Sequence, residues 1–438
     1  MTELTRREIL GIAATVAVGA AATAVVTTVP LWSPWPPRNP DEPYAGPTGN
    51  PLPTHSAPPA EPTAEPTVAA PATGSPVGRP GTSVRPVLAT SYGPNGTHFP
   101  VEVAWPGEKF EHDYVVDADW IVIARALQSL EPEEVAAGVV IRVRPGTLPG
   151  GGDKSSSTVA LGSVGNPAWT RNVLICPEKG YGTVVIDRAG IRLDQCARIS
   201  LFGFVSEGGL AITRCLELQI GWGRFASANV TRGGRNIAFY EVILGFRRND
   251  DDTAGVRPTE TYEMSGIARY GCVYGPSVKS EASGSHCDTV QIEGTSELMF
   301  GPFTSVDCVD YGSSNAAELL HTRLVYAEYR HCLILAGQLP WQVFPLQPGD
   351  YAGDPNAFAG GCLDVRLYDS VVAGAVGRMG FTDVQNTRLS YSPQGSQQPA
   401  SGRWSVDGSV AGWGAGQIMG MQAVPDYEPA TLAALWKW

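Results

Sequence analysis

Apolar residues in the middle of the chain recur at every second position, and this pattern itself repeats. Residues 191–199 align with residues 210–218 at an offset of 19. Ile191 then matches Leu210, and each segment alternates apolar and polar residues before a short break. A period of two is typical of a β-strand, and a fixed longer period is typical of a solenoid. The pattern therefore predicts stacked coils of short parallel strands, each packing on its neighbours.

Six of the eight cysteines follow a similar spacing. The first group is Cys176, Cys196 and Cys215, and the second is Cys287, Cys308 and Cys332. Within each group, the spacing between successive cysteines is close to the period of the repeat. We interpret them as members of inward-facing stacks, because free cysteine behaves as a small buried apolar residue. In an exported protein, neighbouring coils could instead place two sulfur atoms within reach of a disulfide. No cysteine or histidine pair has the spacing of a structural zinc site.

The start of the solenoid is predicted from a change of period. Residues 119–127 have helical spacing, with Trp120, Ile123 and Leu127 on one face and Asp119 as the N-cap. An apolar strand over residues 138–146 follows and ends in Pro-Gly. A short helix of this kind would cover the open end of the first coil.

The densest chemistry of the chain lies in the segment Ser-His-Cys-Asp-Thr-Val-Gln-Ile-Glu-Gly. If this segment is a strand, His286 and Asp288 project from the same face, because positions two apart do so. Val290 and Ile292 have the pattern of inward residues, which places Gln291 outside. The phase changes between Asp288 and Val290, which predicts a bend or bulge.

These residue types suit acid–base chemistry on a sugar. His286 could act as a general acid or base near neutral pH. Asp288 could orient or charge-stabilise the imidazole, or bind a cation, and Gln291 could hold a sugar hydroxyl. The alternative is that His286 and Asp288 are an outward pair at the corner of a coil.

Residues of adjacent coils complete the candidate site. If residues 315–319 stack on residues 288–292, Glu318 lies beside Gln291 and Asn315 lies about 5 Å from Asp288. The offset between these two segments is longer than that of an ordinary coil, so the register stays open.

Two further side chains are predicted to bind substrate. Lys279 lies just upstream, where it could serve as the base of a lyase or neutralise a uronate. Asp310 belongs to the coil that follows.

The chain resembles the right-handed parallel β-helix superfamily, with its pectate-lyase-like fold. The resemblance rests on the cap helix, on Val-Ile-Arg-Val-Arg-Pro-Gly at residues 140–146, on the period shared by the apolar residues and the cysteines, and on the His-x-Asp-x-x-Gln motif. It covers roughly residues 105–395. Thr289 departs from the pattern, which usually has glycine there. The resemblance implies an all-β right-handed parallel β-helix and a carbohydrate substrate.

The resemblance also implies what each reaction would need. A lyase of this fold typically uses calcium held by carboxylates and a lysine or arginine base, whereas a hydrolase uses two or three carboxylates. Calcium is thus the one cofactor the sequence raises, and Asp250, Asp251 and Asp252 are its candidate ligands. Their adjacent spacing is unlike a calcium loop and favours a solvated loop beside a groove.

The N-terminal region has a different character. Residues 1–29 combine Arg6 and Arg7 with a charge-free stretch over residues 9–29, which resembles a twin-arginine export signal or a membrane anchor. Residues 30–86 hold 17 of the 36 prolines and predict a disordered tether. The β-helix domain would then occupy residues 87–438, with a capping loop at its C-terminal end, outside the cytoplasm.

The net charge of −12 argues against nucleic acid as a partner, since that partner requires a basic surface. A polysaccharide or cell-surface glycan fits better. The sequence therefore predicts an exported lyase or glycoside hydrolase that works in a groove along the β-helix. The alternative is a non-catalytic β-helix that binds a glycan or surface partner.

Overall fold

The computed structural model describes residues 97–98, 103–150, 158–259, 262–294, 298–321 and 323–422. The predicted export segment and proline-rich tether lie outside these residues. Among the helices of the described part of the chain, none combines the length and apolarity needed to cross a membrane.

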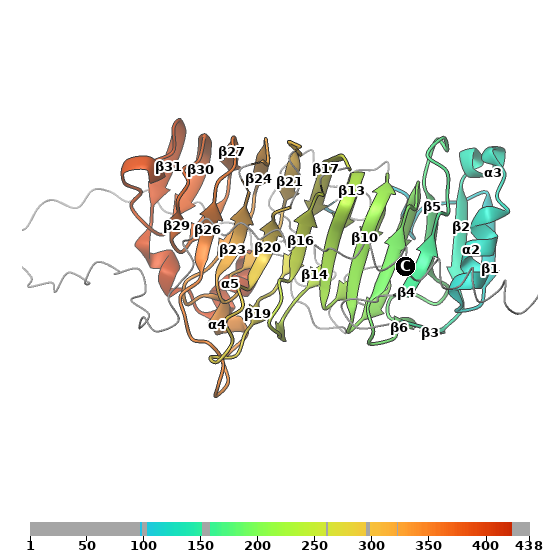
Figure 1. Ribbon diagram of the computed structural model, residues 1–438, viewed down its shortest axis with the longest axis horizontal. Coiled ribbons are helices and arrows are strands. Elements are labelled where there is room, and N and C mark those ends of the chain that lie inside the picture. The colour runs from blue at the N-terminus through green and yellow to red at the C-terminus, as the bar shows by residue number, and fades with distance from the viewer. Residues whose placement is uncertain are drawn as a thin grey trace, which may run out of the picture. The chain divides into compact units, whose positions relative to one another are not determined.

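The described chain is a right-handed parallel β-helix, as predicted (Figure 1). Each coil contributes one short strand to each of three parallel faces, and the chain passes from face 1 to face 2 to face 3 before it returns. Figure 1 shows the coils side by side, from α2 and α3 at one end to β31 at the other.

Face 1 carries the candidate site. It consists of β4 (Thr158–Gly162), β7 (Ile191–Asp194), β10 (Gly209–Leu216), the first half of β13 (Ser227–Tyr240), β16 (Ala254–Arg257), β20 (Asp288–Ile292), β23 (Ala316–Leu320), β26 (Asn356–Gly360) and β29 (Val376–Gly377).

Face 2 consists of β1 (His112–Val116), β2 (Val139–Val143), β5 (Val173–Pro177), β8 (Ile199–Phe202), β11 (Gln219–Gly221), the second half of β13, β17 (Met264–Tyr270), β21 (Phe303–Val306), β24 (Ala327–Arg330), β27 (Val365–Tyr368) and β30 (Asp383–Leu389).

Face 3 consists of β3 (Gly146–Leu148), β6 (Val184–Ile186), β9 (Val205–Ser206), β12 (Arg224–Phe225), β14 (Ile243–Leu244), β18 (Val273–Tyr274), β22 (Val309–Tyr311), β25 (Leu333–Leu335), β28 (Val371–Ala373) and the end of β30. The last strand, β31 (Gly402–Val406), pairs with β30, and β15 (Arg247–Arg248) pairs with β19 (Ser277–Val278).

Apolar side chains fill the interior as ladders that run from coil to coil. Ile191 pairs with Leu210, which confirms the predicted alignment of the two repeats. Further along face 1, Val256 pairs with Ile292, and Ile292 pairs with Leu320. Full burial of such a side chain contributes about 1.5–3 kcal/mol, so these ladders are a main favourable contribution to the stability of each coil.

The N-terminal cap has the predicted form. α2 (Trp120–Gln128) begins after Asp119, whose side chain accepts a 2.7 Å hydrogen bond from the backbone N–H of Ile121. Trp120, Ile123 and Leu127 are its buried face. The helix α3 (Pro132–Ala137) follows, and then β2 enters face 2.

The cysteines form stacks, but not all of those predicted. Cys196 and Cys215 contact each other in successive coils, and Cys272, Cys308 and Cys332 form a second stack. Cys272 was not among the predicted members. The prediction was wrong for two others: Cys176 packs outside the coils on Leu174 and Phe202, and the Cys287 thiol lies near the carbonyl oxygen of Asn249. All eight thiols are free.

An apolar strip on the outer surface includes Phe202 and Tyr240 of face 2 and Val273 of face 3, and segments from both ends of the described chain cover it. Val103, Ala104 and Trp105 pack on it near Trp222, with the two indole rings 5.7 Å apart. Residues that follow β31 cover its other end, through η3 (Gly408–Gly412) and α5 (Ala415–Met421). The remaining short helices of the described residues are α4 (Pro340–Val343) and η2 (Gly395–Gln397).

Candidate functional site

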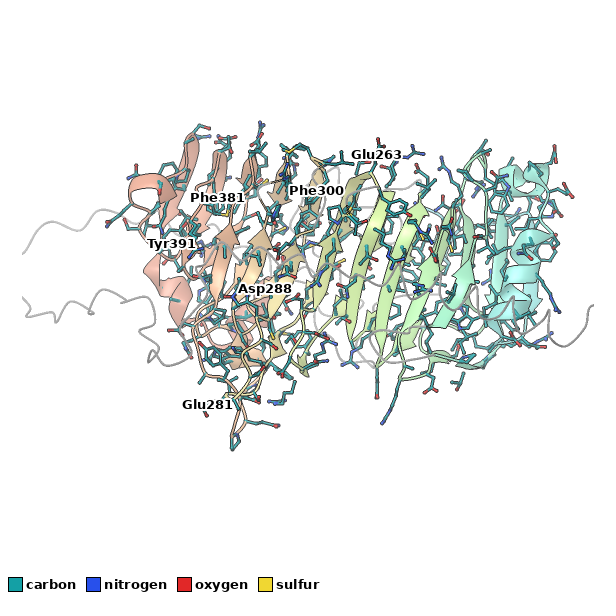
Figure 2. The ribbon with its side chains drawn as sticks, viewed as in Figure 1. Glu263, Glu281, Asp288, Phe300, Phe381 and Tyr391 are labelled. Atoms are coloured by element: carbon teal, nitrogen blue, oxygen red, sulfur yellow. The ribbon has the colours of Figure 1, made fainter. Side chains whose placement is uncertain are left out.

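The predicted pair of His286 and Asp288 is split between a loop and a strand. Asp288 is the first residue of β20, whereas His286 lies in the loop before it. The His286 side chain is 66 % exposed and that of Asp288 is fully buried, with 3.9 Å between Nδ1 and Oδ2. The expectation that both project from one strand face is therefore wrong. Figure 2 shows Asp288 within the stack of coils and Glu281, earlier in the same loop, in the part that projects beyond it.

Asp288 is held by its neighbours from two adjacent coils. Asn315 Nδ2 donates to its Oδ1 at 2.6 Å, which confirms the predicted proximity of these two residues. The backbone N–H of Asp288 donates to Asp252 Oδ1 at 2.8 Å. Burial, followed by the charge of Asp252, raises the pKa of Asp288 well above its usual range. Oδ2 of Asp288 has no hydrogen-bond partner within the described part of the chain.

The predicted bend or bulge between Asp288 and Val290 is wrong, because both residues pair with β23 at the same offset, Asp288 with Ala316 and Val290 with Glu318. Thr289 and Val290 are both buried, and Thr289 Oγ1 lies 2.8 Å from Ser313 Oγ. Beyond them Ile292 faces inward, whereas Gln291 is half-exposed on the outer surface, as predicted.

Glu318 and Asp310 are not surface residues, and their predicted role in substrate binding is wrong. Glu318 pairs with Val290 instead of Gln291, and a register difference of one residue turns a side chain to the opposite face. Inside the coils, Arg269 lies between the two carboxylates. Its Nη1 is 2.5 Å from Asp310 Oδ1 and its Nη2 is 2.5 Å from Glu318 Oε1, with all three side chains buried.

Lys279 also has a local role in the structure. Its Nζ donates to the carbonyl oxygen of Ser285 at 2.9 Å and lies 4.6 Å from the ring centre of Tyr351. These contacts hold the loop that carries His286.

Arg257, which sequence reasoning missed, joins the candidate site together with Asp252, which the sequence had raised only as a calcium ligand. Arg257, at the end of β16, donates from Nη2 to Gln291 Oε1 at 2.6 Å and forms an ion pair with Asp252. Burial raises the pKa of Asp252. Asp252, Arg257, Asp288, Gln291 and Asn315 thus form one connected cluster, with exposed His286 at its edge.

A large groove opens from this cluster along the outer surface of face 1. It has a volume of about 630 Å³ and extends over β7, β10, β13 and β16. Its floor includes Gly209, which has no side chain, and Ala211, whose side chain is a single methyl group, and the two leave the space open. Glycine and alanine at successive outward positions were the sequence signal that could have located it.

Arginine side chains give this groove most of its charge, and we call it the arginine groove. Five arginines line it against three carboxylates: Arg188, Arg192, Arg232, Arg247 and Arg257, and Glu207, Asp251 and Asp252. The Nε atoms of Arg192, Arg247 and Arg257 are buried and have no hydrogen-bond partner among the residues described. Burial lowers the pKa of Arg247. Guanidinium groups with spare donors are suited to carboxylate ligands.

The three consecutive aspartates do not fit a calcium site. Asp252 is already engaged by Arg257 and by the backbone N–H of Asp288. Asp250 Oδ1 instead lies 3.4 Å from the backbone nitrogen of Ser280. Within the described ranges, no cluster of three or more acidic, histidine or cysteine side chains has an arrangement that could hold a metal ion. As predicted, this loop lies beside a groove, and Asp251 and Asp252 line it.

Comparison with known proteins gives similarities at the level of solved structures. No family model matches the chain, and no curated protein does. Pectate lyase Pel9A is 14 % identical with a TM-score of 0.34 over 69 % of this chain and 77 % of its own. A rhamnogalacturonan lyase is 9 % identical with a TM-score of 0.32 over 65 % and 82 %. The A-module of the Azotobacter vinelandii mannuronan C-5 epimerase AlgE6 is 10 % identical with a TM-score of 0.30 over 68 % and 95 %. The β-helix assignment itself rests on the parallel pairing of the strands.

Proposed function

We propose that this protein is a carbohydrate-active β-helix protein that binds an acidic polysaccharide in the arginine groove and cleaves it by β-elimination. The observation that carries the proposal is the charge of the groove. A chain with a net charge of −12 has here a surface with five arginines and three carboxylates. Such a local reversal of charge favours an anionic ligand.

The form of the groove supports a polymer as that ligand. It crosses four neighbouring strands of face 1, which are about 4.8 Å apart, so an extended chain can contact several coils at once. Arg192 and Arg257 lie on the first and last of these strands. Each could pair with a sugar carboxylate through two parallel hydrogen bonds.

The cluster around Asp288 supports chemistry at one end of the groove. In a β-elimination, His286 removes the proton at C5 of a uronate and the electron pair forms the C4–C5 double bond. The bond from C4 to the glycosidic oxygen breaks, and that oxygen takes a proton from solvent. Arg257 would stabilise the carboxylate charge that develops at C5. The buried Asp288 beside His286 would position the imidazole, with catalytic hydrogen bonds closing only in the bound complex.

A second candidate is a protein that binds the same polysaccharide without cleaving it. The 66 % exposure of the His286 side chain and its 3.9 Å separation from Asp288 favour this alternative, because a catalytic base is usually held by a short hydrogen bond. Under either candidate we propose export, with residues 1–29 as the signal or anchor and residues 30–86 as the tether.

The deciding experiment measures products from a panel of acidic and neutral polysaccharides. Wild-type protein is expected to release products from an acidic polymer with the ultraviolet absorbance of a C4–C5 double bond. His286→Ala is expected to lower this rate by at least about a hundredfold, the lower range for a general base. Reducing ends without ultraviolet absorbance would contradict elimination and indicate hydrolysis. Binding without any product would support the second candidate, and no binding to any acidic polymer would contradict both.

A further inference from the structure

A second cleft lies on face 2, whereas the arginine groove lies on face 1. The two share only β13, which contributes its first half to the groove and its second half to the cleft. Its volume is about 330 Å³, and it extends over β11, β13 and β17. Gln219, Ala238 and Ala268 pair in sequence across these strands and form its floor. Two successive alanines at outward positions create the depression.

One wall of this cleft is polar and built from the turns that enter face 2. Arg198, Glu217 and Asn236 occupy equivalent turns with φ values of 55°, 54° and 54°. Asn236 Nδ2 donates to Glu217 Oε1 at 2.8 Å, and Arg198 Nη1 is 3.8 Å from Glu217 Oε2. Arg198 Nε is buried without a hydrogen-bond partner in the described part of the chain. The next turn has Gly266, where a Cβ would lie 2.4 Å from Asn236 Oδ1, so glycine leaves space for the amide.

The opposite wall is aromatic. Tyr240 and Tyr270 occupy successive coils, with ring centroids 5.4 Å apart and planes inclined by 20°. Thr304 closes the end of the floor beyond Ala268. The cleft thus combines an apolar edge with hydroxyl, amide and carboxylate groups on the other side.

We propose that this cleft is a second carbohydrate site and that it takes a neutral sugar. Its lining holds one arginine and one carboxylate, and these two lie close to each other, so there is no excess charge to attract an anion. Amide groups such as Gln219 and Asn236 offer both donors and acceptors, which match the paired hydroxyls of a pyranose. The volume is at the lower end of the range of about 300–1,000 Å³ for small-ligand sites, which fits one or two sugar rings.

Two sites on different faces would let one molecule hold two glycans. If the proposed function is correct, the neutral site would keep the protein on a mixed polysaccharide while the arginine groove works on acidic segments. The second binding event would then be intramolecular, which raises overall affinity without new contacts. The neutral site itself does not depend on the reaction proposed for the groove.

The test measures binding of short neutral gluco-, manno-, galacto- and xylo-oligosaccharides to the full chain by isothermal titration calorimetry. Ala268→Phe is the main variant, because an outward phenylalanine would fill the floor of the cleft. Gln385→Phe is its matched control, since it places the same ring on face 2 outside the cleft. Gln219→Ala removes one amide without filling the space.

At least one neutral oligosaccharide is expected to bind wild type and Gln385→Phe equally. Ala268→Phe should weaken that binding by about tenfold or more, and Gln219→Ala by a smaller factor. Acidic oligosaccharides should bind Ala268→Phe as they bind wild type. The proposal is overturned if no neutral oligosaccharide binds, or if Ala268→Phe and Gln385→Phe behave alike. Loss of acidic binding in Ala268→Phe would overturn the assignment of a neutral ligand. Failure of elimination in the product assay leaves all these outcomes unchanged, so the two proposals are tested separately.

Discussion

His286 Nδ1 and Asp288 Oδ2 lie 3.9 Å apart, and this Asp288 oxygen has no hydrogen-bond partner among the described residues. The pKa of Asp288 is raised well above its usual range by burial and by Asp252, so Asp288 holds its proton over a wider pH range than a free carboxyl does. A protonated carboxyl is compatible with a buried oxygen, whereas an unpaired carboxylate would be costly there. The protonation of Asp288, and with it the charge beside His286, therefore depends on pH.

The first prediction concerns stability against pH for Asp288→Asn. The pKa of Asp288 is higher in the folded protein than in the unfolded chain. Its contribution to the free energy of unfolding is therefore fully present below the unfolded-state pKa near 3.9 and is lost as pH rises through the folded-state pKa. Asparagine is neutral at every pH and keeps the Oδ1 acceptor for Asn315. The variant should therefore gain stability relative to wild type as pH rises above about 4. Urea unfolding across this range measures the difference, with exposed Asp250→Asn as the control. Parallel pH profiles of Asp288→Asn and wild type would contradict the account.

The second prediction concerns the charge of the arginine groove. Arg192→Ala should weaken binding of acidic oligosaccharides by about ten- to a hundredfold, since a hydrogen bond to a charged group contributes about 1.5–3 kcal/mol. It should also reduce the salt dependence of binding, because one ionic contact is lost. Arg403→Ala is the matched control, because Arg403 is exposed on β31, outside the groove. Titration at two salt concentrations tests both effects. Equal losses in both variants would indicate a general effect of net charge.

The coil and its cap could be predicted because both follow from local periodicity. The alternation around Ile191 and Leu210 has one arrangement that buries every apolar side chain, and the strands pair in that register. The face of α2 with Trp120 and Leu127 is likewise fixed by helical spacing. Burial of apolar side chains determines both the register of these strands and the buried face of the helix, and the positions of apolar residues are visible in the sequence.

The geometry of the candidate site could not be predicted from periodicity, because it depends on the register between neighbouring strands. Asp288 pairs with Ala316 instead of Asn315, and this single step in register places Glu318 inside the coil. The loops between β20 and β23 set the register, and their lengths vary from coil to coil. Asp252 and Arg257 reach the site from the preceding coil for the same reason.

The third prediction concerns the buried ion cluster inside the coils. Arg269→Met should destabilise the protein by about 3–5 kcal/mol, because it leaves two buried carboxylates without their cation. Adding Asp310→Asn and Glu318→Gln to this variant should recover much of the loss by removing both charges. Denaturant unfolding measures each variant. A triple variant as unstable as Arg269→Met would show that packing, not charge, is lost. Glycan binding at the groove should be unchanged by Glu318→Gln, since Glu318 does not reach the surface.

The fourth prediction concerns the contact of the N-terminal segment with a turn of the β-helix. Gly271 has a φ of 61°, and a Cβ at this position would lie 2.7 Å from the Cβ of His98. His98 is buried, with its Nδ1 2.7 Å from Asp307 Oδ2, and Asp307 is shared with His331. Gly271→Ala should therefore add two costs, namely backbone strain of about 1–2 kcal/mol and displacement of His98.

Gly337→Ala separates these two costs. Gly337 has nearly the same φ of 62°, but a Cβ there meets nothing within 4 Å, so its substitution costs strain alone. In urea unfolding, Gly271→Ala should be less stable than Gly337→Ala by about 1.5–3 kcal/mol, the contribution of a hydrogen bond to a charged group. The same variant should be cleaved faster by protease on the N-terminal side of Trp105, because displacement of His98 releases that segment from the turn. Equal losses of stability and equal cleavage in the two variants would mean that His98 does not hold the segment in solution.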